Sequence, residues 1–385
     1  MAQGLNETGE FGNTADTTTF LNHPKITMYT MPVLLSIPSI AMRFRPALYF
    51  QPEFKPNPKL YAVVPKATTL VTTTAYPVDP KTCEMHADWH LRARLSLQMF
   101  RDARDLDYEV VCVDAKSDPG WRQKVKDLGV HLLDEDLKQY PGAHFIGRSR
   151  RQGLDAAANL HKNRFIISWL EPEKHPYVKG VIAVPTGSFS PNGYLENSFA
   201  YEETSPLAMT LTPIYEEIAD CIVPRRIDHA SRYPPQAQLE ELMCNFSYQE
   251  SIQGFFYRQT VPRKSPYLDM QVGPKSCHRD LLDFLLRFNG FIKTKEKDGT
   301  IKDNPHDRWE ATFMGYWAML LAGKRVGSVA VPYFHPEEQS ASEYGKPDWN
   351  KKRIDQAVVI TSALDKFLDN FDLNRWWEPK AALTP

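Results

Sequence analysis

Residues 108–114 read Tyr-Glu-Val-Val-Cys-Val-Asp, a nearly unbroken apolar run that ends in an acidic side chain. A short run of this kind, rich in β-branched residues, is typical of a strand that is buried on both faces of a parallel sheet. Upstream, residues 86–104 carry apolar side chains at mostly helical spacing, and residues 70–75 read Leu-Val-Thr-Thr-Thr-Ala. A strand, a helix and a second strand in this order predict a right-handed crossover between parallel strands.

The same alternation continues towards the C-terminus. Further helices are predicted at residues 119–128, 147–160, 233–248 and 351–371, and further strands at 130–133, 164–170, 220–224 and 325–334. The fold class is therefore α/β, with a mostly parallel central sheet flanked by helices.

Prolines divide the chain into parts. The chain has 385 residues and 30 prolines, five of which crowd into residues 46–65. Because proline interrupts helices and strands, we predict an extended or partly disordered arm at 1–65. The strand and helix pattern then predicts one main domain at 66–345, and a C-terminal helix and tail at 346–385 that pack on it.

Composition excludes several classes of protein. Lys and Arg number 46 against 47 Asp and Glu, a balance that does not favour nucleic-acid binding. The five cysteines are widely spaced without a CxxC pair, which predicts free thiols in a reducing compartment. The apolar stretch at 31–42 is too short to cross a bilayer and does not resemble a secretory signal. We therefore expect a cytoplasmic protein with no transmembrane segment.

Polar residues follow several predicted strands directly. These residues are Tyr76, Asp114, the pair Glu171 and Glu173, and Arg225. Because ligands of open α/β sheets bind beyond the carboxyl ends of the strands, we expect these side chains to line one edge of the sheet.

Acids and arginines in one cleft suit a nucleoside diphosphate sugar, which carries negative charge and hydroxyl groups. Asp114 would accept hydrogen bonds from the ribose or base, and Arg148, Arg150 and Arg151 would neutralise the diphosphate. The two glutamates would hold a divalent cation. A solvated helix face for the arginines and a capping role for Asp114 are the structural alternatives.

Four stretches carry a family resemblance: Thr72-Thr-Thr-Ala-Tyr-Pro, Val111-Cys-Val-Asp-Ala-Lys-Ser-Asp118, Gly147-Arg-Ser-Arg-Arg-Gln-Gly and Trp169-Leu-Glu-Pro-Glu-Lys174. In this order they resemble the first half of a GT-A type glycosyltransferase, near the family 2 and mannosylglycerate-synthase-like enzymes. The resemblance covers roughly residues 68–340, and it implies a donor half at 66–226 and an acceptor half at 227–345.

The resemblance also implies roles for single residues. Asp114, with Ser117 and Asp118, would contact the nucleoside, and Arg148 and Arg151 would lie near the donor. Glu171 and Glu173 stand where the family has its metal-binding DxD, which implies Mn or Mg. The longer side chains and the intervening proline depart from that motif and leave open that no metal is needed.

The second half of the chain offers the remaining candidates. Asp269 and Glu310 lie in stretches that resemble acceptor-side loops, and each is a candidate general base. His335 follows a predicted strand and is a candidate third member of the metal group. An inverting enzyme would use such a base, whereas a retaining enzyme would not, and both remain open.

The predicted function is that of a glycosyltransferase, here a hexosyltransferase. It would move a sugar from a UDP- or GDP-sugar to an acceptor hydroxyl. A nucleotidyltransferase that makes activated sugars is one alternative, although residues 74–79 lack its glycine-rich phosphate loop. A non-catalytic nucleotide-sugar-binding protein is the other, suggested by the altered DxD.

Overall fold

The fold was analysed in a computed structural model of the chain. The chain divides into two units, Met1–Phe50 and Gln51–Pro385. The structure describes residues 57–85, 87–136, 138, 145–179, 182–185, 199–202, 205–226, 235–258, 268–286, 293–295, 301–303, 313–331, 336, 338–339 and 347–370, all of which belong to the second unit.

A seven-stranded sheet forms the centre of this unit, with the strand order β12-β7-β9-β4-β1-β2-β3. Its members are β1 (Thr68–Thr74), β2 (Glu109–Asp114), β3 (His131–Asp134), β4 (Ile166–Trp169), β7 (Cys221–Ile222), β9 (Lys275–His278) and β12 (Val326–Gly327). Strand β9 runs antiparallel to both of its neighbours, and the other neighbouring pairs of the sheet are parallel. The expected α/β class with a mostly parallel sheet is therefore confirmed.

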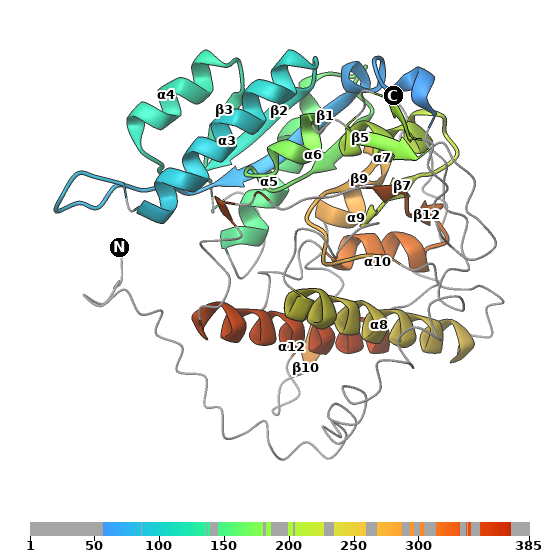
Figure 1. The fold of residues 1–385 in the computed structure, drawn as a ribbon. Helices are drawn as coiled ribbons and strands as arrows, with labels where there is room; N and C mark the ends of the chain where they lie inside the picture. The colour runs from blue at the N-terminus through green and yellow to red at the C-terminus, as the bar shows by residue number, and fades with distance from the viewer. Residues whose placement is uncertain are drawn as a thin grey trace. The chain divides into compact units, whose positions relative to one another are not determined.

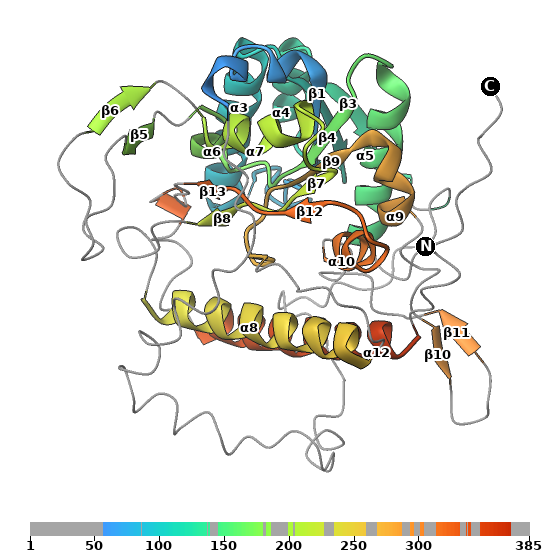
Figure 2. The same cartoon turned by 90° about the vertical axis from the view of Figure 1, so that its right-hand side faces the viewer.

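Helices cover both faces of the sheet (Figures 1 and 2). On one face lie α5 (Phe145–Leu160), α9 (Leu282–Leu286) and α10 (Met314–Leu321). On the other lie α3 (Ala87–Asp105), α6 (His175–Lys179) and α7 (Pro206–Tyr215), with α4 (Pro119–Asp127) beside α3. The architecture expected from the GT-A resemblance, a mostly parallel sheet flanked by helices, is what the chain adopts.

Two long helices pair with each other, α8 (Pro235–Arg258) and α12 (Pro347–Asn370). Ile360, Leu364 and Phe367 of α12 are fully buried, as their helical spacing predicts, whereas Ile354 and Val358 are 60% and 52% exposed. No helix among the described residues is both long and apolar enough to cross a membrane.

Short elements complete the described structure. The strand pairs are β5 (Ile182–Pro185) with β6 (Phe199–Glu202), β8 (Arg225–Arg226) with β13 (Ala330–Val331), and β10 (Lys293–Lys295) with β11 (Ile301–Asp303). The 3-10 turns are η3 (Pro58–Leu60), η4 (Val64–Ala67) and η5 (Arg279–Leu281).

The folded unit begins before residue 66. Asn57 donates a hydrogen bond to Glu216 at the end of α7 at 2.7 Å, and Val64 in η4 is fully buried against the core. Residues 57–65 thus contact the rest of this unit through 3-10 turns, and the predicted division of the chain at residue 65 stays a prediction.

Gly153 lets α5 approach the sheet. A Cβ atom at this position would lie 2.7 Å from Cγ1 of Val71 and 3.3 Å from Cγ2 of Val113. Gly153→Ala should therefore lower the free energy of unfolding by about 2 kcal/mol, because the methyl group overpacks the helix against β1 and β2.

The matched control is Gly254→Ala in α8, where a Cβ atom would meet nothing within 4 Å. Alanine should stabilise that helix by about 0.5–1 kcal/mol. Urea denaturation of both variants tests the close packing of α5, and two changes of the same sign would contradict it.

Candidate functional site

Asp114 ends β2 and organises the carboxyl edge of the sheet. It is 1% exposed and accepts hydrogen bonds from the Thr74 hydroxyl at 2.8 Å and from the Ser117 backbone NH at 3.0 Å. Arg122 of α4 forms an ion pair with Asp114 and reaches Asp134 at the end of β3. Asp114 thus holds the ends of β1, β2 and β3 together. These contacts give it a structural role, as in the capping alternative, that extends over three strands.

Tyr76 connects Asp114 with Glu173. Its backbone NH donates to the Ser117 hydroxyl at 2.7 Å, and its own hydroxyl donates to Glu173 at 3.3 Å. The ring meets Trp121 edge to face, with centroids 5.1 Å apart. Burial, and then the nearby Glu173 carboxylate, raise the pKa of Tyr76 well above its ordinary value. Three residues predicted to share one edge of the sheet therefore lie together.

The two glutamates after β4 have different surroundings. Glu173 is 5% exposed, and one oxygen accepts from Tyr76 and lies 3.2 Å from a guanidinium nitrogen of Arg92. The Glu171 side chain is 45% exposed and lies 3.2 Å from the ammonium nitrogen of Lys174. Glu173 is thus a buried, compensated carboxylate, whereas Glu171 reaches the surface.

Lys275 is a site residue that the sequence analysis did not identify. It begins β9 directly opposite Trp169, the last residue of β4, and is 1% exposed. Its ammonium group donates to the carbonyl oxygen of Val272 at 2.7 Å and lies 5.0 Å from the centroid of the Phe313 ring. The sequence did not predict strand β9, because Lys-Ser-Cys-His lacks the apolar run that marks the other strands. Lys275 was therefore not recognised as a residue at the edge of the sheet.

Charged groups of both signs surround Lys275. Burial is the main cause that lowers the pKa of Lys275, Asp269 and Glu171 raise it, Arg150 and Arg226 lower it, and the net result is a pKa of about 7. Two carboxylates and two guanidinium groups from separate parts of the chain therefore lie near this ammonium group.

Asp269 is committed to a buried ion pair. Arg226 donates to both of its carboxylate oxygens, at 2.7 and 2.8 Å, and Asn245 of α8 donates a further bond at 2.9 Å. Asp269 is 1% exposed. A carboxylate held by a guanidinium is a poor proton acceptor, so this geometry favours a positioning role over the predicted role of general base.

The predicted donor arginines lie in different environments. Arg151 is 1% exposed, which does not fit direct contact with a donor, whereas Arg148 and Arg225 are half-buried. Arg150, between the two predicted residues of α5, lies 4.6 Å above the centroid of the Trp169 ring and close to Lys275. Its position on α5 therefore brings Arg150 close to Trp169 and Lys275 at the edge of the sheet. Glu310 and His335 lie outside the described residues.

The fit of a divalent cation to Glu171 and Glu173 can be tested on these contacts. Magnesium and manganese require open carboxylate oxygens. Arg92 and Tyr76 already engage Glu173, while Lys174 and Lys275 surround Glu171 with positive charge. A divalent cation at this pair would therefore compete with these resident cations for the carboxylate oxygens.

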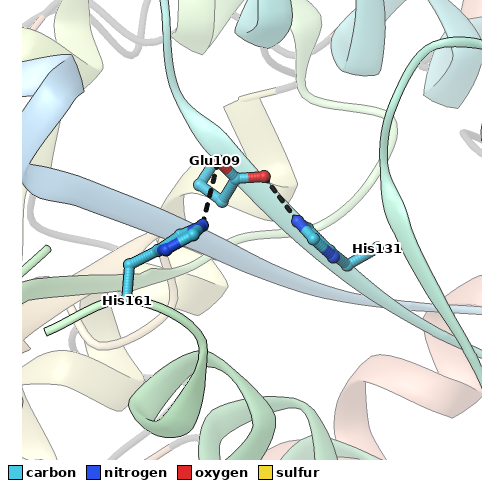
Figure 3. A group of neighbouring side chains, drawn as sticks. All are labelled: Glu109, His131 and His161. Carbon is cyan, nitrogen blue, oxygen red and sulfur yellow. Dashed lines mark hydrogen bonds and ion pairs between the residues drawn. The ribbon is translucent and has the colours of Figure 1, made fainter.

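A separate group with metal-type ligands lies at the other end of β2. Figure 3 shows His131 and His161 approaching Glu109, at 2.7 and 4.0 Å. Glu109 begins β2 and Asp114 ends it, so about 16 Å of strand separate this group from the candidate site. Arg104 and Arg164 also contact Glu109, at 3.2 and 3.6 Å, and their charges oppose a cation there.

Comparison with known proteins finds likeness only among solved structures. No family model matches the chain, and no curated protein matches it. A glucosyl-3-phosphoglycerate synthase of M. tuberculosis is similar at 10% identity and a TM-score of 0.41, over 82% of this chain and 85% of that one.

Two further structures of that Mycobacterium tuberculosis enzyme are similar at 10% identity. One, in complex with phosphoglyceric acid, has a TM-score of 0.42 over 81% of this chain and 83% of that one. The other, in complex with Mn2+, UDP and glucosyl-3-phosphoglycerate, has a TM-score of 0.41 over 84% and 88%.

Asp269→Asn should lower the free energy of unfolding by about 3 kcal/mol, because it leaves the buried Arg226 without its counter-charge. Urea denaturation measures this loss. Asp280→Asn is the control, since that side chain is 84% exposed beside His278 and its loss should change stability by less than about 0.5 kcal/mol. A fully stable Asp269→Asn protein without activity would instead support the role of general base.

Lys275 should make stability depend on pH. Its pKa is about 7 in the folded chain and higher when unfolded, so the unfolded chain binds more protons between about pH 7 and 10. The folded state therefore gains stability as the pH rises through this window. Relative to Lys275→Met, the wild type should gain about 2 kcal/mol between pH 7 and 9, measured by urea denaturation.

Lys66→Met provides the control, since Lys66 is 67% exposed beside Asp107. Its stability should follow the wild type at both pH values. If the free energy of unfolding of wild type and of Lys275→Met changes equally with pH, the lowered pKa of Lys275 is contradicted.

Proposed function

We propose that this chain is a glycosyltransferase that moves a sugar from a nucleoside diphosphate sugar to an acceptor hydroxyl. The observation that carries the proposal is the place of Arg150, which is half-buried and lies 4.6 Å above the ring of Trp169 at the end of β4. Ligands of open α/β sheets bind at this edge, and a guanidinium group there suits a diphosphate.

The chemistry of transfer explains why positive charge belongs there. The bond between the anomeric carbon of the sugar and a diphosphate oxygen breaks, and the acceptor oxygen bonds to that carbon and loses its proton. The leaving diphosphate gains charge as the bond breaks, so nearby cations stabilise the transition state more than the intact donor. Of the two predicted bases, Glu310 is the one retained in this proposal, because Asp269 is bound to Arg226.

The donor and acceptor remain as proposed from the sequence. UDP- or GDP-sugars are the candidate donors, and a hydroxyl compound is the acceptor. The enzyme with the similar fold is described with UDP, Mn2+ and a phosphoglycerate product, which agrees with a donor of this class. The five free cysteines support the cytoplasm as the compartment.

The connection after β1 argues against a nucleotidyltransferase. Residues 75–86 between β1 and α3 contain no glycine. Glycine is what allows a backbone to approach phosphates closely in the glycine-rich loops of nucleotide-binding enzymes. A non-catalytic binding protein would share the cations but would release no nucleoside diphosphate from the donor.

Replacement of Arg150 tests this proposal. Arg150→Met should weaken the binding of a UDP- or GDP-sugar at least tenfold, because a charge-assisted contact to phosphate is worth about 1.5–3 kcal/mol. Isothermal titration calorimetry measures the affinity, and release of UDP or GDP with an acceptor present measures transfer. The control is Arg101→Met on the exposed face of α3, which should bind as the wild type does.

Binding without release would support the non-catalytic alternative. Release of pyrophosphate from a nucleoside triphosphate would support the nucleotidyltransferase. Equal affinities of Arg150→Met and wild type for the nucleotide sugar would show that Arg150 does not contact the donor.

A further inference from the structure

Trp169 carries a buried N–H group that has no hydrogen-bond acceptor. The residue is 7% exposed, and its indole nitrogen Nε1 is closed off from solvent without a hydrogen-bond partner among the described residues. An N–H group that is buried on folding loses its hydrogen bonds to water, so a donor left without a partner costs free energy. Because nearly all buried polar groups in folded proteins do have partners, this exception requires a physical reason.

Comparable side chains of the same unit find their partners. Ser168, which precedes Trp169 on β4, shares a hydrogen bond of 2.9 Å with the hydroxyl of Ser276 on β9. The buried indole nitrogen of Trp121 donates to the carbonyl oxygen of Ala93 at 3.1 Å. The fold thus satisfies a neighbouring polar group and a second buried tryptophan, and it leaves the N–H of Trp169 for another partner.

Trp169 lies where a ligand would approach the sheet. It is the last residue of β4, which pairs in parallel with β1, so it lies at the carboxyl edge. Ligands of open α/β sheets bind beyond this edge. The guanidinium of Arg150 lies 4.6 Å above the centroid of the Trp169 ring. The unsatisfied N–H therefore lies beside the arginine on which the proposed function rests.

The chemistry of indole limits what this partner can be. An indole N–H donates a hydrogen bond and accepts none, so the partner must offer a lone pair. Hydrogen bonds to an ionised oxygen are stronger than those to a neutral one, and the adjacent guanidinium attracts an anion. Arg150 is half-buried, and rotation of its long side chain towards a phosphate would uncover the ring beneath it. A phosphate oxygen therefore suits both groups.

We propose that Trp169 belongs to the diphosphate-binding site, and that its indole N–H donates a hydrogen bond to a diphosphate oxygen beside the guanidinium of Arg150. The N–H has already lost its water on folding, so the bond to the diphosphate is gained without a second cost of desolvating this group. The proposal rests on the proposed function and deepens it, because it assigns a second contact to the diphosphate.

Nuclear magnetic resonance of the indole N–H groups tests this inference on the full wild-type chain with isotope-labelled tryptophan. The spectra of Trp169→Phe and Trp121→Phe assign the two resonances, because each variant lacks one of them. Saturating UDP or GDP with Mg2+ should move the Trp169 proton downfield, since a hydrogen bond to an ionised oxygen deshields it. The Trp121 resonance is the control and should keep its position, because its N–H already donates to Ala93.

Isothermal titration calorimetry under the same conditions separates the possible failures. If UDP or GDP binds without a downfield shift of the Trp169 resonance, the inference is overturned and the proposed function stands. A shift that appears with UDP-glucose or GDP-mannose, but not with UDP or GDP, places the contact on the sugar and also overturns the inference. Binding of none of these nucleotides overturns the proposed function and the inference with it.

Trp169→Phe tests the same contact through affinity, because it keeps an aromatic ring beneath Arg150 and removes the N–H. It should weaken binding of UDP or GDP at least about tenfold, as expected for the loss of a hydrogen bond to a charged group. Trp121→Phe loses the same side-chain volume and also a hydrogen bond to Ala93, so its melting temperature should fall further than that of Trp169→Phe. A folded Trp169→Phe protein with the affinity of the wild type contradicts the inference.

Discussion

A buried ammonium group must find oxygen atoms inside the protein, and this constraint shapes the carboxyl edge of the sheet. Lys275 finds them in the carbonyl groups of Val272 and Gly273. The same loop begins with Asp269, which Arg226 and Asn245 hold from two other elements. Burial of these charges therefore joins β8, α8 and β9 at one place.

Polar side chains at this edge serve two purposes. Asp114 and Glu173 hold the ends of the strands together through Arg122, Tyr76 and Arg92, and they are closed off from solvent. Glu171 remains at the surface, 3.2 Å from the ammonium nitrogen of Lys174. The buried carboxylates thus have a structural role, and Glu171 is the carboxylate of this edge that reaches solvent.

Much of the sheet was predictable, because buried parallel strands have a local signature. The apolar runs at β1, β2 and β4 and the helical spacing of α3, α5 and α12 were each recognised near their observed bounds. Strand β9 was missed because Lys-Ser-Cys-His has no such run. Its place between β4 and β7 depends on pairing with residues more than fifty positions away, which no local pattern encodes.

By itself, the sequence determined the α/β class and the meeting of Tyr76, Asp114 and Glu173 at one edge, since residues that follow parallel strands must end on the same side of a sheet. Only the tertiary structure decided which of these charges are already paired. Arg151 is buried, Arg150 lies over Trp169, and Asp269 forms an ion pair with Arg226. The reason is physical: the role of a charged side chain depends on its burial and on its nearest counter-charge, and both come from distant parts of the chain.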